Sequence, residues 1–380
     1  MKKHPAGIRN FIMFARSRYP VAPKHVFLIG RGVHYVHQQT YQNNTNPAVK
    51  ANLEKLNLVP TFGFPASDML LGADLSNSRP LVPVGRLTAI TPAEVATYLK
   101  KVKDYDTAQR TLSPSISDKD WMKQVLHIIG AGDVFLDDIL FQYMENYRNK
   151  IQDSLMGAKV TTFRKVSTSN VEQLNDEDLT RLINNGVSLI TYYGHSSATT
   201  LEFNLDDPAN YNNAGKYPMF FALGCNAGNT FDYNEGRFVT RSYLSDKYVL
   251  APERGSINFL ASTHFGVVHY LDIYNSRAYT NMSTTLYGAT IGEIMQKTVH
   301  DVYTYTDDFF ARANAEETVM NGDPAVRLNQ QPKPDYALTD DMVSVSPSFV
   351  SVADQSFAVK VQFKNLGRVT NKNIVVETKR

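Results

Sequence analysis

The sequence VSLITYYGHSS, residues 187–197, and the sequence KYPMFFALGCNAGNT, residues 216–230, decide the fold of this chain. Each contains a short apolar run that ends in glycine, and the next residue is His195 in the first and Cys225, the only cysteine, in the second. Such runs are typical of buried strands in a parallel sheet, which binds ligands at the carboxyl ends of its strands. The pattern predicts that an imidazole and a thiol meet at one sheet edge, as a thiol nucleophile and its base require.

Two other interpretations fit the same residues. A lone cysteine is often a small buried apolar residue, and His195 would then be a hydrogen-bonded loop residue. Alternatively, the sequence GHSSA at 194–198 approaches the G-x-S-x-G nucleophile elbow of serine hydrolases. That elbow requires a helix directly after the serine, whereas residues 197–213 contain β-branched threonines, a proline and several asparagines, and its last glycine is replaced by Ala198. The sequence favours Cys225 as the nucleophile and keeps a serine esterase using Ser196 as an alternative.

Composition bounds the class of protein. A chain of 380 residues, 43% of them hydrophobic, is long enough for two to three domains. The net charge of +2 comes from interspersed acidic and basic residues, so nucleic acid is not expected as a partner. A single cysteine excludes a disulfide framework and a multi-thiolate zinc site. No apolar run approaches the roughly 20 residues of a membrane span, and the first ten residues lack a signal-peptide core, so we expect a piece of a longer protein.

Strands and helices alternate along most of the chain, which predicts an α/β fold with two parallel-sheet subdomains of Rossmann-like or caspase-like type. Residues 1–118 form the first subdomain: strands at 24–29 and 79–84, a polar surface loop at 34–65, and a helix that begins at Thr91 with a capping box. Residues 119–330 form the catalytic subdomain, with strands at 124–129, 158–163, 187–193, 218–223 and 256–261 and helices at 134–155, 176–185, 270–286 and 291–305.

The last part of the chain has a different pattern. After a proline-bearing linker at 329–335, residues 336–380 contain segments near 342, 356 and 374 in which apolar and polar residues alternate, as in strands with one buried face. About 45 residues are fewer than the roughly 100 of a complete β-sandwich. We therefore expect an incomplete sandwich module at this end.

Several segments resemble one known family. They are PLVPVGRL at 80–87, TPAEVATYLKKVKDYD at 91–106, GSINFLAS at 255–262 and NGDPAVRL at 321–328. Together with the Gly-His and Cys motifs and their order, they resemble the gingipain-type cysteine peptidases of the caspase-fold clan, over roughly residues 20 to 330. The segment after Asp335 is similar to the immunoglobulin-like modules that follow such domains.

The resemblance implies a role for each residue of the two motifs. Cys225 would form a thioester with the acyl part of a polypeptide substrate, and His195 would be the general base. The backbone N–H groups of Ser196 and Cys225 would form the oxyanion hole, worth on the order of 3 kcal/mol per donor. The family commonly has glycine after the histidine, where this chain has Ser196, so the geometry of this loop is left open.

A third catalytic group would orient the imidazole. A caspase-like strand order, 2-1-3-4, places the loop at 130–138 beside the histidine strand. Asp133, Asp137 and Asp138 lie in this loop, and each can equally be a carboxylate that complements a helix dipole. Asp133 is the first choice for the orienting group.

Loops at the same sheet edge are expected to carry the residues that determine substrate specificity. Gingipains select basic residues through a pocket carboxylate, which this sequence does not identify. The loop after the fifth strand carries His264 and Phe265, which are predicted to line the substrate pocket together with Glu202. His264 also competes with His195 for the role of base.

The sequence thus predicts a cysteine endopeptidase that is secreted or lies on a bacterial cell surface, with association to a secretion system as an option. No cofactor or catalytic metal is required. The acidic residues Glu202, Asp206 and Asp207 are either a solvated loop or a site for calcium as an optional structural ion, as in relatives. The alternative from another class is a catalytically silent, peptidase-like scaffold in secretion or adhesion.

Overall fold

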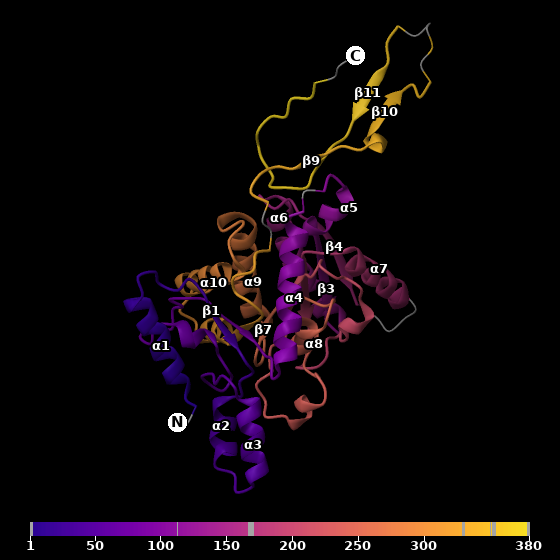
Figure 1. The fold of residues 1–380 in the computed structure, drawn as a ribbon. Helices are drawn as coiled ribbons and strands as arrows, with labels where there is room; N and C mark the ends of the chain where they lie inside the picture. The colour runs from indigo at the N-terminus through magenta and orange to yellow at the C-terminus, as the bar shows by residue number, and fades with distance from the viewer. Residues whose placement is uncertain are drawn as a thin grey trace.

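The computed structural model describes residues 3–111, 113–165, 171–328, 331–349, 351 and 355–377. Its centre is an eight-stranded sheet with the strand order β1-β2-β8-β7-β6-β5-β3-β4 (Figure 1). The strands are β1 (Val26–Ile29), β2 (Val84–Leu87), β3 (Gln124–Gly130), β4 (Lys159–Arg164), β5 (Leu189–Gly194), β6 (Met219–Leu223), β7 (Asn258–Ser262) and β8 (Thr318–Asn321). The helices are α1 (Pro5–Arg18), α2 (Tyr35–Gln42), α3 (Pro47–Leu56), α4 (Pro92–Gln109), α5 (Ile116–Lys119), α6 (Val134–Gln152), α7 (Val171–Asn185), α8 (Leu244–Leu250), α9 (Val268–Thr280), α10 (Ile291–Tyr305) and α11 (Phe309–Glu317).

The five strands β3 to β7 are mutually parallel, with the first strand between the second and the third, as the caspase-like order predicted. β8 then pairs antiparallel with β7 and parallel with β2. The N-terminal strands therefore run opposite to β3–β7 but belong to the same sheet. The α/β fold is confirmed, while the boundary at residue 118 stays a prediction.

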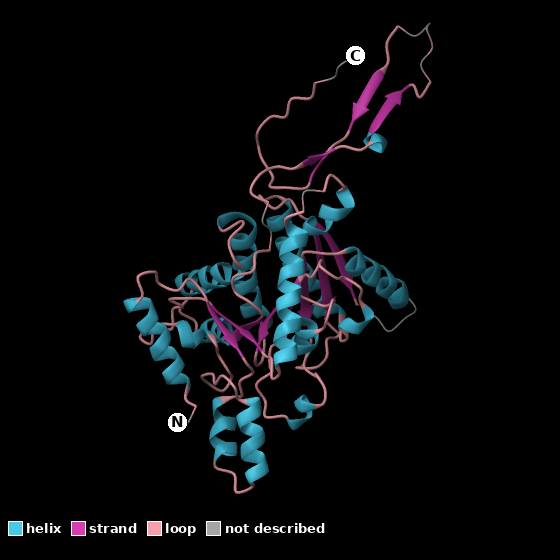
Figure 2. Ribbon diagram, viewed as in Figure 1, coloured by secondary structure: helices cyan, strands magenta, loops and turns pink. Residues whose placement is uncertain are grey.

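Helices cover both faces of the sheet (Figure 2). On one face, Thr191 of β5 bonds to Tyr279 of α9, between their hydroxyl oxygens at 2.7 Å. On the other face, Phe220 of β6 packs against Tyr248 of α8, with ring centroids 5.0 Å apart. Since neighbouring strand residues point to opposite faces, α9 and α8 lie on opposite sides of one buried layer of strands. Burial on both faces explains why β5 and β6 are almost wholly apolar.

The helix after β2 begins as the sequence predicted. The Thr91 hydroxyl accepts from the Glu94 amide at 3.3 Å, and the Glu94 carboxylate accepts from the Thr91 amide at 3.3 Å. β2 itself begins at Val84, so the predicted strand at 79–84 was placed too early. The capping box located the helix better than the apolar pattern located the strand, because a cap is a local interaction between specific side chains.

The prediction of a polar surface loop at 34–65 was wrong. Residues in this range form α2 and α3, and the Asn46 side chain caps α3 by accepting from the Ala48 amide at 2.9 Å. Leu53 and Leu56 of α3 are buried in a small cluster with Val33. The helix signal lay in a few apolar residues and one cap within a mostly polar segment, which a composition-based interpretation overlooks.

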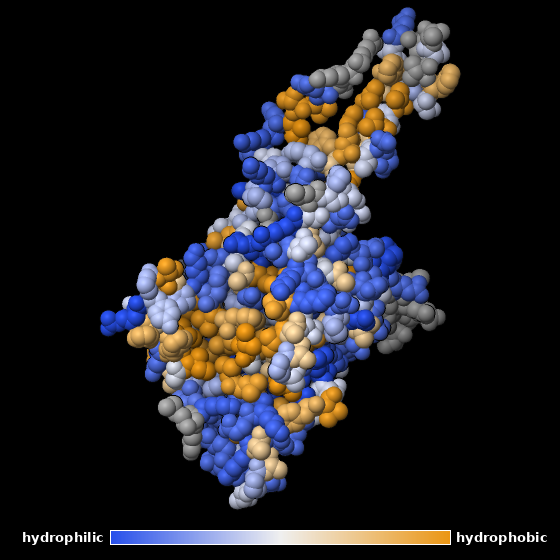
Figure 3. Space-filling view, viewed as in Figure 1, coloured by the Kyte–Doolittle hydropathy of each residue, from blue (hydrophilic) through white to orange (hydrophobic). Residues whose placement is uncertain are grey.

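The C-terminal segment carries β9 (Tyr336–Ala337), β10 (Val343–Ser346), β11 (Ala358–Val361) and β12 (Lys364–Asn365), in two small two-stranded sheets. The apolar residues of β10 and β11 are at the surface, as Figure 3 shows for this upper part of the molecule. The strand expected near 374 is not formed within the described residues up to 377. The predicted domain end at 330 lies outside the described residues, and the immunoglobulin-like module stays a prediction.

Within the described residues, no helix has the length and apolar character that crossing a membrane requires.

Candidate active site

The pairing of β5 with β6 puts His195 and Cys225 just after the ends of two neighbouring strands. Leu189 pairs with Met219, and every following pair keeps the same offset, 219 − 189 = 30 residues. His195 and Cys225 have this offset too, 225 − 195 = 30, and each is the first residue after the glycine that follows its apolar strand. Adjacent strands lie about 4.8 Å apart, so the shared offset puts both residues at the carboxyl edge, after neighbouring strand ends.

A direct bond joins the two loops. The Ser196 hydroxyl donates to the main-chain carbonyl of Cys225 at 2.8 Å. Gly224 makes this approach sterically feasible, because a Cβ at that position would lie 2.2 Å from the Ser196 Oγ and 2.5 Å from the Gly194 carbonyl oxygen. The glycines that the sequence places before His195 and Cys225 are therefore required by close backbone packing.

The main chain of His195 is fixed on both sides while its ring is exposed. Its amide donates to the Gly130 carbonyl at 2.8 Å, and its carbonyl accepts from the Glu202 amide at 3.1 Å and from the Tyr192 hydroxyl. A Cβ on Gly132 would lie 3.6 Å from the Cδ2 atom of His195. The loop between β3 and α6 therefore borders the imidazole, as predicted.

Cys225 is half-buried and begins a tight turn. Its Sγ lies 3.7 Å from the Gly266 carbonyl oxygen, in the loop after β7. The next residue, Asn226, has φ of 58°, a left-handed conformation that asparagine adopts more readily than most residues. The Asn226 amide donates to the His264 carbonyl at 2.7 Å. The turn thus presents the thiol at the sheet edge and ties it to a third loop.

That third loop exposes aromatic side chains. The His264 ring lies between Phe265, with centroids 4.5 Å apart, and Phe64, with centroids 6.3 Å apart. Phe265 is 64% exposed and Phe64 is 59% exposed. His264 and Phe265 lie on the loop after β7, and their place in a substrate pocket stays a prediction. Phe64 was missed because nothing in the sequence links residue 64 to residue 264.

A second residue that the sequence did not single out, His34, packs against Phe64. His34 is buried between the rings of Phe64 and Phe231, and its Nε2 is 3.1 Å from the Asn229 side-chain oxygen. Burial lowers the pKa of His34 to about 4, outweighing the nearby Asp232 carboxylate. His34 is therefore neutral near pH 7 and supports the loop that follows Cys225.

The aspartates of the loop at 130–138 all have partners. The Asp133 carboxylate caps α6 by accepting from the Leu136 amide at 2.9 Å. The buried Asp137 accepts from Arg164, and Asp138 accepts from the same guanidinium at 2.8 Å. Asp137 and Asp138 are thus held in an ion-pair cluster, whereas Asp133 follows Gly132, the residue that borders the imidazole.

The acidic loop after His195 uses its carboxylates as local caps. Asp206 accepts from the Leu201 amide at 2.7 Å, and Asp207 accepts from the Ala209 amide at 2.9 Å. Glu202 is exposed at the rim. No group of three or more metal-ligating side chains occurs in the part of the chain that the structure describes. These residues do not form a ligand set that fits calcium, and calcium binding stays a prediction from the resemblance.

The residues after Ser196 do not form a nucleophile elbow. An isolated bridge joins Ser196 to Leu201, and the first helical turn after it is the short one at Pro208–Asn210. The Ser196 hydroxyl donates to a main-chain carbonyl rather than to an imidazole. The geometry that a serine nucleophile requires is therefore not built here.

Comparison with known proteins agrees with this geometry. No curated protein matches the chain. Among solved structures, the chain is similar to the Arg-specific cysteine proteinase gingipain R (RGPB), with a TM-score of 0.62, 16% identity, and coverage of 88% of this chain and 71% of that one. It is also similar to the complex of Porphyromonas gingivalis RgpB pro- and mature domains, with a TM-score of 0.61, 15% identity, and coverage of 88% and 73%. A third structure, described as a protease, has a TM-score of 0.60, 16% identity, and coverage of 90% and 75%.

These identities show a shared fold. The model of peptidase family C25 matches residues 2–329, which is most of the chain and includes both motifs of the site. The chain therefore belongs to peptidase family C25, the gingipain family of cysteine endopeptidases.

Proposed function

We propose that Cys225 and His195 hydrolyse peptide bonds as a catalytic dyad. The observation that supports this proposal is the 30-residue offset of the β5–β6 pairing, which His195 and Cys225 share, together with the Ser196 bond to the Cys225 carbonyl that joins the two loops. A thiol becomes an effective nucleophile when a neighbouring imidazole takes its proton.

The reaction follows from these positions. His195 accepts the proton of the Cys225 thiol, and the thiolate attacks the carbonyl carbon of the scissile bond. The resulting tetrahedral intermediate expels the amine, which leaves with the proton from the imidazolium, and a thioester remains on Cys225. His195 then deprotonates a water molecule, which hydrolyses the thioester and restores the thiol.

An oxyanion hole at this site would consist of the backbone N–H groups of Ser196 and Cys225. Within the described residues, neither N–H donates to a protein acceptor. Both belong to residues at the ends of the two loops that the Ser196 hydroxyl joins. Donors that are fixed and free of protein acceptors can stabilise the negative oxygen as it develops.

Asp133 is the proposed orienting group for the imidazole. One carboxylate oxygen caps α6, and the second is available for an interaction with the neighbouring imidazole. Its neighbour Gly132 lies against the His195 ring. His264, Phe265 and Glu202, on the loops around the dyad, are the proposed substrate contacts.

Secretion or display on a bacterial surface, with association to a secretion system, is proposed on the resemblance to gingipains. The same dyad would then act on extracellular polypeptides.

The test is hydrolysis of a peptide library by the full chain and by Cys225→Ala, His195→Ala and Ser196→Ala. We expect the first two variants to lose at least about a thousandfold in kcat/KM and the third to retain measurable activity. Iodoacetamide should inactivate the enzyme in proportion to alkylation of Cys225. Unchanged hydrolysis in Cys225→Ala with inactivation by a serine-directed phosphonate would establish the esterase alternative, and a chain that cuts no peptide and alkylates no faster than free cysteine would be a silent scaffold.

A further inference from the structure

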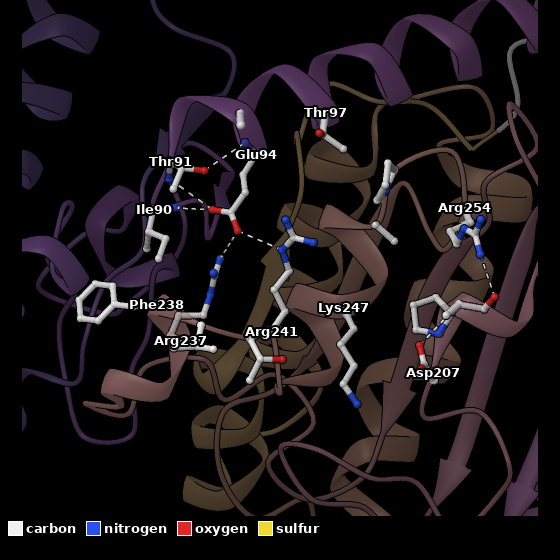
Figure 4. Close-up of a pocket in the computed structure, with 17 residues that line it drawn as sticks. Ile90, Thr91, Glu94, Thr97, Asp207, Arg237, Phe238, Arg241, Lys247 and Arg254 are labelled. Carbon is white, nitrogen blue, oxygen red and sulfur yellow. Dashed lines mark hydrogen bonds and ion pairs between the residues drawn. The ribbon is translucent and has the colours of Figure 1, made fainter.

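A polar pocket lies between the start of α4, the turn at Glu235–Phe238, α8 and the loop that follows β5 (Figure 4). Its volume is about 760 Å³, within the range of about 300–1,000 Å³ that is typical of ligand sites. None of the predicted catalytic residues lines it. The pocket is nevertheless connected to the active site, because the Leu244 amide at the start of α8 donates to the carbonyl of Ala198, three residues after His195, at 2.9 Å.

Cations dominate the accessible lining of this pocket. Arg241, Lys247 and Arg254 are partly exposed within it, on three separate segments. Figure 4 shows Arg241 in the middle of the pocket, Lys247 beside it and Arg254 at the far side. Positive charge spread along a cavity fits an extended ligand with more than one negative group better than a single small ion.

The negative charges that line the pocket are already engaged. The carboxylate of Glu94 is nearly buried and accepts from Arg237 at 2.9 Å and from the Nε atom of Arg241 at 3.0 Å. Arg237 also pairs with the buried Asp246 at 3.0 Å, so its own charge is neutralised inside the protein. The Asp207 carboxylate is exposed and caps the turn after it, a main-chain bond that leaves its charge in place. Lys247 and Arg254 therefore outnumber Asp207, the lining carboxylate for which no ion pair is described.

Each of the three cations is held by a hydrogen bond that uses only part of its N–H donors, so other donors remain for a ligand. Arg241 is fixed through Nε, so its terminal nitrogens extend beyond the Glu94 contact. Lys247 donates to the Asp206 carbonyl at 3.2 Å, and Arg254 donates to the Ala209 carbonyl at 2.8 Å. A main-chain carbonyl carries no net charge, so these two bonds orient the side chains without neutralising them. The Asp206 carboxylate also lies near Lys247, whose charge opposes the rise in the Asp206 pKa that burial causes. Preorganised guanidinium and ammonium groups are suited to carboxylate ligands.

We infer that this pocket is an exosite for an acidic segment of the polypeptide substrate. The inference rests on the proposed peptidase function for the identity of the ligand, since a peptidase brings an extended chain to the loops after β5 and β6. Apolar residues between the cations, including Ile90, Phe238 and Val239, would contact the aliphatic parts of such a segment. Carboxylates placed away from the scissile bond would strengthen substrate binding without taking part in the chemistry.

The binding test uses the full chain with Cys225→Ala, so that nothing is cleaved. A fluorescein-labelled peptide of alternating glutamate and serine is compared by anisotropy with its glutamine counterpart. We expect the acidic peptide to bind roughly tenfold or more tightly, with an affinity that falls as salt is raised. Lys247→Gln and Arg241→Gln should each weaken binding severalfold, whereas Arg181→Gln, an exposed cation on α7 outside the pocket, should not.

A charge reversal guards against effects of misfolding. Lys247→Glu should bind the acidic peptide more weakly and a matching lysine–serine peptide more tightly. A misfolded variant would not gain affinity for the second peptide. Equal binding of the acidic and glutamine peptides, or equal losses in Arg181→Gln and Lys247→Gln, would overturn the inference.

A kinetic arm uses the active enzyme. An acidic extension on a cleavable peptide should lower KM and leave kcat unchanged, and Lys247→Gln should remove this gain. If no peptide is cleaved, the proposed function fails, but anisotropy with Cys225→Ala still decides whether the pocket binds acidic peptides. If cleavage occurs and the extension has no effect on KM, the exosite is overturned while the dyad stands.

Discussion

Ser196 and Cys225 are joined by a hydrogen bond of 2.8 Å, from the serine hydroxyl to the cysteine carbonyl, so the loops after β5 and β6 fix each other. The bond lies one residue from His195 and on Cys225 itself. In this chain, a side chain stabilises the relative position of the histidine and cysteine loops.

Ser196→Gly tests that bond. The variant keeps the backbone N–H proposed for the oxyanion hole but loses the hydroxyl, so we expect kcat to fall several-fold and KM to change little. A neutral hydrogen bond contributes about 1 kcal/mol, which is somewhat less than a tenfold effect. Ser197→Gly, whose hydroxyl bonds to threonines within its own loop, is the control. Full activity in Ser196→Gly would show that the bond does not position the dyad.

Gly224→Ala should disrupt the site more severely. The added methyl group would lie 2.2 Å from the Ser196 Oγ and 2.5 Å from the Gly194 carbonyl, and the second contact is with backbone. We expect loss of peptidase activity and a decrease of about 1–3 kcal/mol in the free energy of unfolding, measured in urea. Gly7→Ala, in α1 and with no atom within 4 Å of the new Cβ, is the matched control and should be neutral or stabilising.

Two substitutions separate the two roles of Asp133, as the cap of α6 and as the group proposed to orient His195. Asparagine caps a helix as well as aspartate does, so Asp133→Asn should keep its thermal stability while losing the carboxylate proposed to orient His195. We expect about a tenfold loss in kcat for this variant. Asp133→Ala should lose activity and also about 1 kcal/mol of stability, because the bond to the Leu136 amide is gone. If Asp133→Asn keeps the kcat of the wild type, Asp133 acts only as a helix cap.

Phe265 is expected to contact substrate. It is 64% exposed and adjoins Gly266, whose carbonyl lies near the Cys225 thiol. Phe265→Ala should raise KM severalfold for peptides with an apolar residue next to the scissile bond, with a smaller change in kcat, because uniform binding is removed. Phe309→Ala, 74% exposed on α11, is the control. The same increase in KM for both variants would argue against a role for Phe265 in the pocket.

Glu317 should make stability depend on pH. Burial raises its pKa to about 7, against a bond from the Ser262 hydroxyl that lowers it. The folded protein therefore holds the proton more tightly than the unfolded chain, and the stability from this group is present below about pH 4.5 and is lost as the pH rises through about 7.

Replacement by glutamine tests this dependence. Glu317→Gln should stabilise the protein by about 1–2 kcal/mol at pH 8 and by little at pH 5, measured by urea unfolding. Equal effects of Glu317→Gln at both pH values would contradict this dependence.

The sequence contains most of what puts His195 and Cys225 after neighbouring strand ends. The apolar runs before Gly194 and Gly224 predicted β5 and β6, and two parallel neighbours deliver their following residues to one edge. The Thr91 capping box predicted the start of α4, which forms one wall of the polar pocket lined by Arg241 and Lys247. These signals are local, so one sequence suffices to find them.

The remaining features depend on contacts between distant segments. Phe64 reaches His264 across 200 residues, and Arg237 reaches Glu94 across 143 residues. Neither pair has a local pattern. The joining of β2 to β8 into a common sheet is equally long-range, which explains why two separate parallel sheets were predicted.

The equal offset of strand pairing and of the His195–Cys225 pair has a consequence for chain length. The relative position of the two strand ends is set by hydrogen bonds between β5 and β6, and the Ser196 and Glu202 bonds act at the start of the connection. Insertions or deletions around 209–215 would disturb the bonds of the buried Asn213 with Gly255, but would leave His195 and Cys225 after neighbouring strand ends as long as both strands keep their register. This loop can therefore diverge in length, and with it one side of the polar pocket, while the chemistry is conserved.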